Sequence, residues 1–136
     1  MLAFDFGARR IGVAVGNTLT RVAHPLATID EEAAVPRFAA IAALVGEWQP
    51  GILVVGVPVH ADGTPHAMTA RARRFARQLL GRHRLPVVEA DERHTTQDAQ
   101  ATLGASGRGG RQGRAARDAI AAQAILQGWF DAGAPR

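Results

Sequence analysis

The chain has no cysteine among its 136 residues. It therefore has no disulfide, no thiolate metal site, no zinc ribbon and no thiol nucleophile. No apolar run approaches the roughly 18 residues of a transmembrane helix. The first five residues contain no basic group and reach a carboxylate at once, which is not the pattern of a signal peptide. These absences favour a cytoplasmic protein with no membrane partner.

Lysine is also absent, so all sixteen basic residues are arginines. The net charge of +4 is unevenly distributed along the chain. Segment 71–117 holds eleven arginines and four acidic residues, whereas the rest holds five arginines and eight acidic residues. A basic segment in an otherwise acidic chain indicates a polyanionic partner. Arginine binds phosphate through two parallel hydrogen bonds and stacks on bases, which is compatible with nucleic acid.

The size of the chain fits one compact domain of 14.4 kDa. A hydrophobic content of 47% and a charged content of 21% are typical of a soluble globular protein. We expect a single domain over residues 1–136, with a frayed tail from about residue 132 to residue 136.

Five segments have the pattern of β-strands. Segments 2–6 and 11–16 alternate with a period of two and are joined by a short connection, which predicts a β-hairpin. Segment 22–29 contains Pro25, which indicates an edge strand or a bulge. Segment 52–57 is apolar throughout, as in a strand buried on both faces, and segment 87–90 is the fifth strand.

Helices are predicted between and after these strands. Pro36 predicts the start of the first helix, and Thr64 with Pro65 predicts the start of the second. The expected apolar stripe of the first helix is Phe38, Ile41, Ala42, Val45 and Trp48, and that of the second is Met68, Ala72, Phe75 and Leu79. We expect a short helix over 95–103, a mobile glycine-rich loop over 104–113 and a last helix over about 115–130. The order β-β-β-α-β-α-β-α predicts an α/β fold, a five-stranded mixed sheet with helices on both faces.

Asp5 is the first candidate for chemistry, because it lies inside an otherwise apolar strand. If the hairpin pairs as predicted, Asp5 shares a face with Gly12, Ala14 and Gly16. Such a floor of small residues would leave room for a metal ion and a substrate backbone. The alternative is a carboxylate that accepts hydrogen bonds from the backbone of the turn at Gly7.

Three further acidic residues complete the candidate set. Asp91 and Glu92 end the fifth strand, where ligands gather in open α/β sheets; alternatively, they form part of a solvated strand end and helix cap. Asp118 lies on the apolar stripe of the last helix, so it should point toward the sheet; the alternative is an ion pair with Arg114. Carboxylates without cysteine suit hard cations, and two Mg²⁺ or Mn²⁺ ions about 4 Å apart would activate water and stabilise the leaving oxygen of a phosphodiester.

Arginines of the last loop form a candidate binding surface. Arg108, Arg111, Arg114 and Arg117 recur at every third position with no acidic residue between them. No aromatic residue is interleaved, so contacts to phosphate are favoured over base stacking. The alternatives are a solvated charged loop and a competing footprint on the arginine stripe of 71–77.

Six motifs run through nearly the whole chain in a fixed order. They are residues 5–16 (DFGARRIGVAVG), 55–58 (VGVP), 62–64 (DGT), 69–72 (TARA), 91–96 (DERHTT) and 118–122 (DAIAA). Together they resemble the YqgF, or RuvX-like, family. The resemblance implies a fold similar to ribonuclease H and to the RuvC resolvase. It also implies a metal-dependent nuclease that matures the 5′ end of pre-16S ribosomal RNA, junction resolution being an older proposal.

The resemblance implies that Asp5, Glu92 and Asp118 are the catalytic, metal-binding carboxylates, with Asp91 as a fourth candidate ligand. Resolvases of the RuvC type carry an acid on the fourth strand, whereas here that strand ends with Gly56, Val57 and Pro58, so the acid would come from the fifth strand. The expected nucleic-acid contacts are Arg9, Arg10, Arg71, Arg93, Arg108, Arg111 and Arg114.

The expected partner is pre-rRNA in ribosomal precursor particles, with branched or single-stranded DNA as an alternative, and the expected state is a monomer or a weak homodimer. One rival hypothesis is a Holliday-junction-type DNA resolvase. Another is a noncatalytic RNA-binding module for ribosome assembly, which would show no metal-dependent cleavage. A sugar-kinase-like or actin-like ATPase is disfavoured, because such enzymes place the nucleotide between two domains and this chain supplies one.

Overall fold

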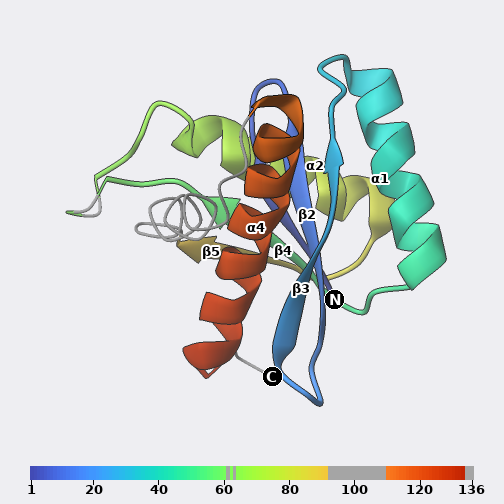
Figure 1. Ribbon diagram of the computed structural model, residues 1–136, viewed down its shortest axis with the longest axis vertical. Helices are drawn as coiled ribbons and strands as arrows, with labels where there is room; N and C mark the ends of the chain where they lie inside the picture. The colour runs from blue at the N-terminus through green and yellow to red at the C-terminus, as the bar shows by residue number, and fades with distance from the viewer. Residues whose placement is uncertain (61, 63, 92–109, 134–136) are drawn as a thin grey trace.

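The chain folds around one five-stranded sheet (Figure 1). The computed structural model describes residues 1–60, 62, 64–91 and 110–133, and for residues 91, 110–112 and 114 it describes the backbone alone. In chain order the elements are β1 (Leu2–Phe6), β2 (Ile11–Asn17), β3 (Val22–Ile29), α1 (Ala34–Trp48), β4 (Leu53–Val57), α2 (Thr69–His83), β5 (Val87–Asp91) and α4 (Gly110–Asp131). The predicted order β-β-β-α-β-α-β-α is confirmed, and the predicted helix over 95–103 lies outside the described residues.

The sheet is mixed, with the strand order β3-β2-β1-β4-β5. β1 pairs antiparallel with β2 and parallel with β4, and β5 adds a second parallel pair on β4. β3 is an edge strand, and its register with β2 shifts where Ala14 pairs with Pro25. The edge and the bulge predicted from Pro25 are therefore both present, because proline cannot donate to a continuous ladder.

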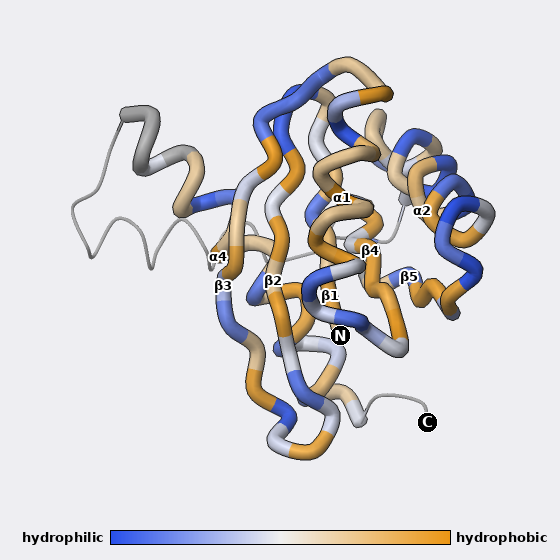
Figure 2. The backbone as a smooth tube through the Cα atoms, turned by 90° about the vertical axis from the view of Figure 1, so that its right-hand side faces the viewer, coloured by the Kyte–Doolittle hydropathy of each residue, from blue (hydrophilic) through white to orange (hydrophobic). Residues whose placement is uncertain are grey.

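Helices cover both faces of the sheet, which makes three layers. On one face, α1 and α2 bury a cluster that includes Phe4, Phe38 and Phe75. On the other face, α4 packs through Ala122, Ile125, Leu126 and Phe130 on small residues of the strands. Figure 2 shows the strands as largely hydrophobic segments between these helical layers, and α2 with hydrophilic segments along it. No helix within the described parts of the chain is both long and apolar enough to cross a membrane.

Two glycines of β2 set how closely α4 approaches the sheet. A Cβ atom placed on Gly12 would lie 1.8 Å from the backbone carbonyl oxygen of Asp118. One placed on Gly16 would lie 2.7 Å from Leu126 Cδ2 and 2.9 Å from Phe130 Cε2. The expectation explained the small residues of this floor by room for a metal ion and a substrate backbone, but at Gly12 and Gly16 the structure shows helix α4 as the neighbour. These positions are small because helix α4 occupies the space above them.

Amide side chains of α4 bind the backbone of the edge strand β3. Gln127 Oε1 accepts a hydrogen bond of 3.0 Å from the N–H of Ala23, and Gln123 Nε2 donates one of 3.0 Å to the carbonyl of the same residue. Gln127 Nε2 also donates to the carbonyl of Arg21 at 3.0 Å. Because Ala23 is buried, its backbone polar groups need partners, and the two glutamines supply them.

We expect Gln127→Ala to lower the free energy of unfolding by about 1–3 kcal/mol, because the buried N–H of Ala23 loses its acceptor. Denaturant unfolding followed by circular dichroism measures this change. Glu47→Ala, at an exposed position of α1, is the control and should change stability by less than about 0.5 kcal/mol. Equal stability of the two variants would contradict the role given to Gln127.

Helix starts differ from their predicted positions at three places. α1 begins at Ala34, two residues before Pro36. α2 begins at Thr69 rather than at Thr64, because Thr64 bonds to the Asp62 carboxylate through its N–H and its hydroxyl and so belongs to a turn. α4 begins at Gly110 rather than near residue 115. Residues 110–113 are therefore helical, not loop; Gly113 is buried, and tertiary packing outweighs the low helix propensity of glycine there.

The side chains of the first two helices partly follow the predicted stripes. Ala72, Phe75 and Leu79 of α2 are buried as predicted. In α1, however, Ala42 is exposed and Trp48 is 43% exposed, so both lie off the buried face. Arg37 is buried there instead, next to Phe38 and Ile41.

Candidate functional site

Asp5 lies near the end of the central strand β1. It pairs with Gly12 of β2 on one side and with Gly56 of β4 on the other. Directly opposite residues of an antiparallel pair carry their side chains on the same face, and the pair Ala3–Ala14, two residues earlier, belongs to the core under α4. The half-buried side chain of Asp5 therefore lies on the α4 face of the sheet.

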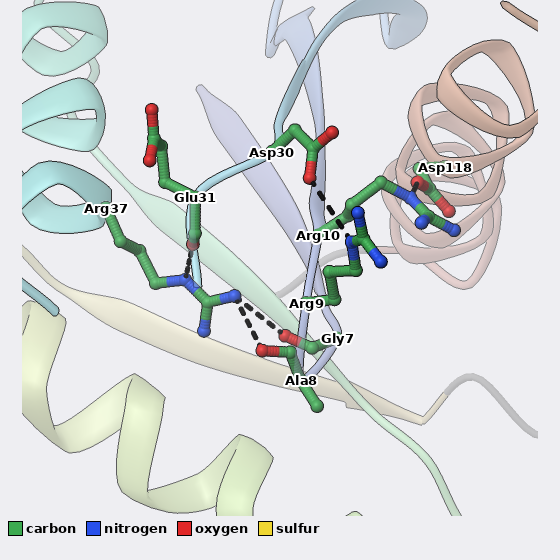
Figure 3. A network of polar contacts seen from close by, with 8 residues as sticks. All are labelled: Gly7, Ala8, Arg9, Arg10, Asp30, Glu31, Arg37 and Asp118. Atoms are coloured by element: carbon green, nitrogen blue, oxygen red, sulfur yellow. Dashed lines mark hydrogen bonds and ion pairs between the residues drawn. The ribbon is translucent and has the colours of Figure 1, made fainter. Parts of the chain in front are cut away.

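Asp118 reaches the same place from helix α4. Its backbone carbonyl rests on Gly12, the residue that pairs with Asp5. The Asp118 side chain turns to the sheet, where Oδ2 accepts a hydrogen bond of 2.7 Å from Nε of Arg10 (Figure 3). This bond raises the pKa of Arg10, and the two side chains are only 27% and 22% exposed. Two residues 113 positions apart in the chain thus adjoin Gly12, Asp5 as its strand partner and Asp118 through its backbone carbonyl.

The alternative predicted from the sequence was an ion pair between Asp118 and Arg114. A surface pair with Arg114 would have left the carboxylate turned away from the sheet. The structure gives Asp118 the partner Arg10, which directly precedes β2, and the side chain of Arg114 is not among the described groups. Asp118 therefore faces the sheet, as its position on the apolar stripe predicts.

The other predicted carboxylates are not placed relative to this pair. Asp91 is the last residue of β5, where its backbone pairs with Val57, and its side chain is not described. Glu92 lies outside the described residues. Within the described parts of the chain, no three His, Cys, Asp or Glu side chains gather closely enough to hold a metal ion. The placed pair, Asp5 and Asp118, supplies the oxygen donors that a hard divalent cation prefers.

The predicted nucleic-acid contacts fall into three groups. Arg9 and Arg10 follow β1. Arg9 is exposed, and its Nε lies 3.8 Å from Oδ1 of Asp30. Arg71 is exposed on α2, across the sheet from Asp118. Arg93 and Arg108 lie outside the described residues, whereas Arg111 and Arg114 lie in the first turns of α4, where the backbone alone is described. The predicted mobile loop lies outside the described residues from 104 to 109.

Arg37 holds the turn that connects Asp5 to Arg10, a role that the sequence patterns did not reveal. Its Nη2 donates to the carbonyls of Gly7 at 3.2 Å and Ala8 at 2.9 Å, and its Nε donates to the carbonyl of Glu31 at 2.6 Å (Figure 3). The side chain is only 6% exposed, and burial lowers its pKa. A charged residue on the apolar stripe of a predicted helix was the signal that could have identified it.

Glycine is required in the same turn. A Cβ atom on Gly7 would lie 2.4 Å from the carbonyl oxygen of Arg10. The turn can therefore close tightly, and Arg10 leaves it in the direction of Asp118 (Figure 3). Gly7 and Arg37 together determine the path of the backbone between the candidate carboxylate and its neighbouring arginines.

Comparisons with known proteins find relatives that are more than half identical to this chain. A protein from Dechloromonas aromatica is 56% identical over 131 residues, which cover 96% of this chain and 90% of the relative. A protein from Nitrosomonas europaea is 56% identical, with coverages of 96% and 88%, and one from Chromobacterium violaceum is 55% identical, with coverages of 96% and 96%. All three carry the name "Putative pre-16S rRNA nuclease".

A solved structure shares the fold. T. thermophilus RuvC, determined in complex with a Holliday junction substrate, superposes with a TM-score of 0.55. The superposition covers 98% of this chain and 96% of the RuvC chain. The sequences are 17% identical, so this likeness concerns the ribonuclease H-like fold alone. A family model described as "RuvX: Holliday junction resolvase" matches residues 1–132. The match spans both candidate carboxylates and nearly the whole chain, and the protein therefore belongs to the RuvX family.

Proposed function

We propose that this protein is a divalent-metal-dependent nuclease whose substrate is precursor 16S ribosomal RNA, cut at its 5′ end. The observation that carries the proposal is that Asp5 and Asp118 both adjoin Gly12 on one face of the sheet. Membership of the RuvX family and the names of the relatives support the reaction and the substrate. The ribonuclease H-like fold supplies a sheet of the same architecture as a resolvase.

Asp5 and Asp118 would hold the metal through carboxylate oxygens. Bound Mg²⁺ or Mn²⁺, as two ions, would supply activation of a water molecule and stabilisation of the leaving oxygen. The chain itself contributes the placement of the donors: Asp5 is held by two neighbouring strands, and Asp118 is held by the close packing of α4 on Gly12. Arg10 orients the carboxylate of Asp118 through its hydrogen bond to Oδ2.

A third carboxylate would come from the end of β5. In that strand Glu89 contacts Arg73 of α2 at 3.4 Å, whereas Ala90 packs with the α4 cluster. Ala90 therefore lies on the same face of the sheet as Asp5. The resemblance of motif 91–96 to the family implies Glu92 as the third ligand, with Asp91 as a fourth candidate.

Cleavage of defined substrates tests the proposed function. Purified protein is incubated with end-labelled precursor 16S RNA and with a four-way DNA junction, each with Mg²⁺, with Mn²⁺ and with excess chelator. We expect cleavage of the precursor RNA near the mature 5′ end, with metal only. The Asp118→Asn protein, prepared identically, controls for contaminating nucleases.

The same assay separates the rival functions. A resolvase, which the description of the family model favours, would cut the four-way junction symmetrically and leave the precursor RNA intact. A noncatalytic assembly module would bind precursor RNA or ribosomal precursor particles without cleaving either substrate. Either result would overturn the proposed substrate, and the second would overturn the proposed reaction as well.

A further inference from the structure

A small arginine-lined pocket lies on the face of the sheet opposite Asp118. It has a volume of about 190 Å³ between α1, α2 and the end of β1. Three arginines line it, Arg37 from α1 and Arg71 and Arg74 from α2, together with the ring of Phe6 and the carboxylate-bearing Glu32. Its volume is below the roughly 300 Å³ at which pockets for drug-sized ligands begin, so it suits a small group.

Positive charge converges in this pocket. The guanidinium carbons of Arg37 and Arg71 lie 5.5 and 5.9 Å from the centre of the same Phe6 ring. Arg37 is buried, and its hydrogen bonds go to backbone carbonyls rather than to a carboxylate. Among the residues that the structure describes, neither Arg71 nor Arg74 forms an ion pair. Three guanidinium groups therefore face one carboxylate, and an anion would relieve their mutual repulsion.

Burial and neighbouring charge both act on the pKa of the buried Arg37. Burial is the main cause of the lowered pKa of Arg37, and the neighbouring charge of Arg71 lowers it further, while Glu32 acts in the opposite direction. Arginine remains protonated at any physiological pH, so the pocket keeps its positive charge. Planar guanidinium groups that surround an aromatic ring present donors suited to phosphate oxygens.

The pocket also lies next to the candidate active site along the chain. Phe6 directly follows Asp5, and consecutive strand residues point to opposite faces. Their Cα atoms are about 3.8 Å apart. Arg37 links the two sites, because the side chain that lines the pocket also holds the carbonyls of Gly7 and Ala8.

We propose that this pocket binds one backbone phosphate of the nucleic-acid strand, away from the bond that is cut, as the strand passes the end of β1 beside Asp5. The proposal rests on the proposed function, since it places a second contact of the same substrate. Arg71 and Arg74 would bind the phosphate, and Arg37 would fix the pocket in position relative to the turn after β1.

The test compares two double variants of the same helix. Arg71→Ala with Arg74→Ala removes two pocket arginines, whereas Arg73→Ala with Arg77→Ala removes two arginines that do not line it. All four side chains are exposed, and both variants lose the same charge, so both should fold; circular dichroism checks this. The affinity for a single-stranded RNA oligonucleotide is measured with chelator present, over a series of salt concentrations.

We expect the pocket variant to bind RNA about tenfold more weakly than the control variant, as for the loss of a charge-assisted hydrogen bond. Its slope of log K against log salt should be flatter by about 0.7, because the variant neutralises one phosphate fewer. Equal affinities and slopes for the two double variants would overturn the proposal, because the pocket would then contribute no more than general charge.

A second pair of ligands identifies the source of the phosphate. The oligonucleotide is used with a 5′-phosphate and with a 5′-hydroxyl group. If the pocket variant binds both ligands more weakly than the control variant by the same factor, the result supports a backbone phosphate. A decrease confined to the 5′-phosphorylated RNA would overturn the proposal in favour of a terminal phosphate. Binding is measured without metal, so this test can fail independently of the proposed function. The proposed function fails if the wild-type protein cleaves no substrate when metal is present.

Discussion

Asp5→Asn is expected to abolish metal-dependent cleavage and to leave the fold intact. The amide has the size of the carboxylate but lacks the charge that attracts a divalent cation. Metal ions stabilise the transition state of such reactions by several kcal/mol, so we expect kcat/KM to fall at least about 100-fold. Asp5 is half-buried at a strand end and pairs with two glycines through its backbone, so circular dichroism and the melting temperature should change little. Single-turnover cleavage of precursor RNA measures the decrease.

Two controls make the Asp5 result specific. Glu47→Gln removes one negative charge from an exposed position of α1 and should retain full activity. If Asp5 and Asp118 hold the same ions, the double variant Asp5→Asn with Asp118→Asn should be hardly worse than either single variant, because residues that act as one unit are not additive. Multiplication of the two defects would show that Asp118 has a separate role, such as its pairing with Arg10.

Gly12→Ala is expected to be severely destabilising even though it adds one methyl group. The new Cβ would lie 1.8 Å from the carbonyl oxygen and 2.3 Å from the carbonyl carbon of Asp118. These are backbone atoms of a long helix, so no flexible side chain can turn aside. Overpacking in a core costs about 1–3 kcal/mol, and we expect the upper end of this range or more. The protein that still folds should no longer cleave RNA, because α4 must move away from the sheet and carry Asp118 with it.

A second glycine provides the matched control. Gly46 lies in α1, and a Cβ atom placed there meets nothing within 4 Å. Gly46→Ala should therefore stabilise the protein by about 0.5–1 kcal/mol through helix propensity alone. Thermal unfolding and RNA cleavage are measured for both variants. A Gly12→Ala protein with the melting temperature of the Gly46→Ala protein would contradict the packing argument and the position given to α4.

Local patterns predicted much of the scaffold. The period-two alternation of residues 2–6 and 11–16 predicted the hairpin and the face that Asp5 shares with Gly12, and the observed register pairs these two residues. The apolar stripe of the last helix correctly predicted that Asp118 faces the sheet. These features depend on neighbours within a few positions, which is the range over which periodicity carries information.

Helix boundaries followed local signals less well. Thr64 with Pro65 has the composition of a helix start, yet Thr64 is bound by Asp62 in a turn and α2 starts at Thr69. The glycines of 110–113 have the composition of a loop, yet they are helical. In both places a hydrogen bond or a packing contact outweighed a propensity of about 1 kcal/mol per residue or less.

The sequence by itself determined the order of the elements, the faces of the residues in the first two strands, the absence of thiol chemistry and the motifs of the family. Only the tertiary structure decided that Gly12 and Gly16 make room for α4, that Arg10 is the partner of Asp118 and that Arg37 closes the turn after Asp5. Asp118 and Arg10 are 108 positions apart, and Arg37 and Ala8 are 29 apart. Such contacts arise when helices dock on the sheet, and their partners are selected by shape and hydrogen bonding across the layers, which no local period of the chain records.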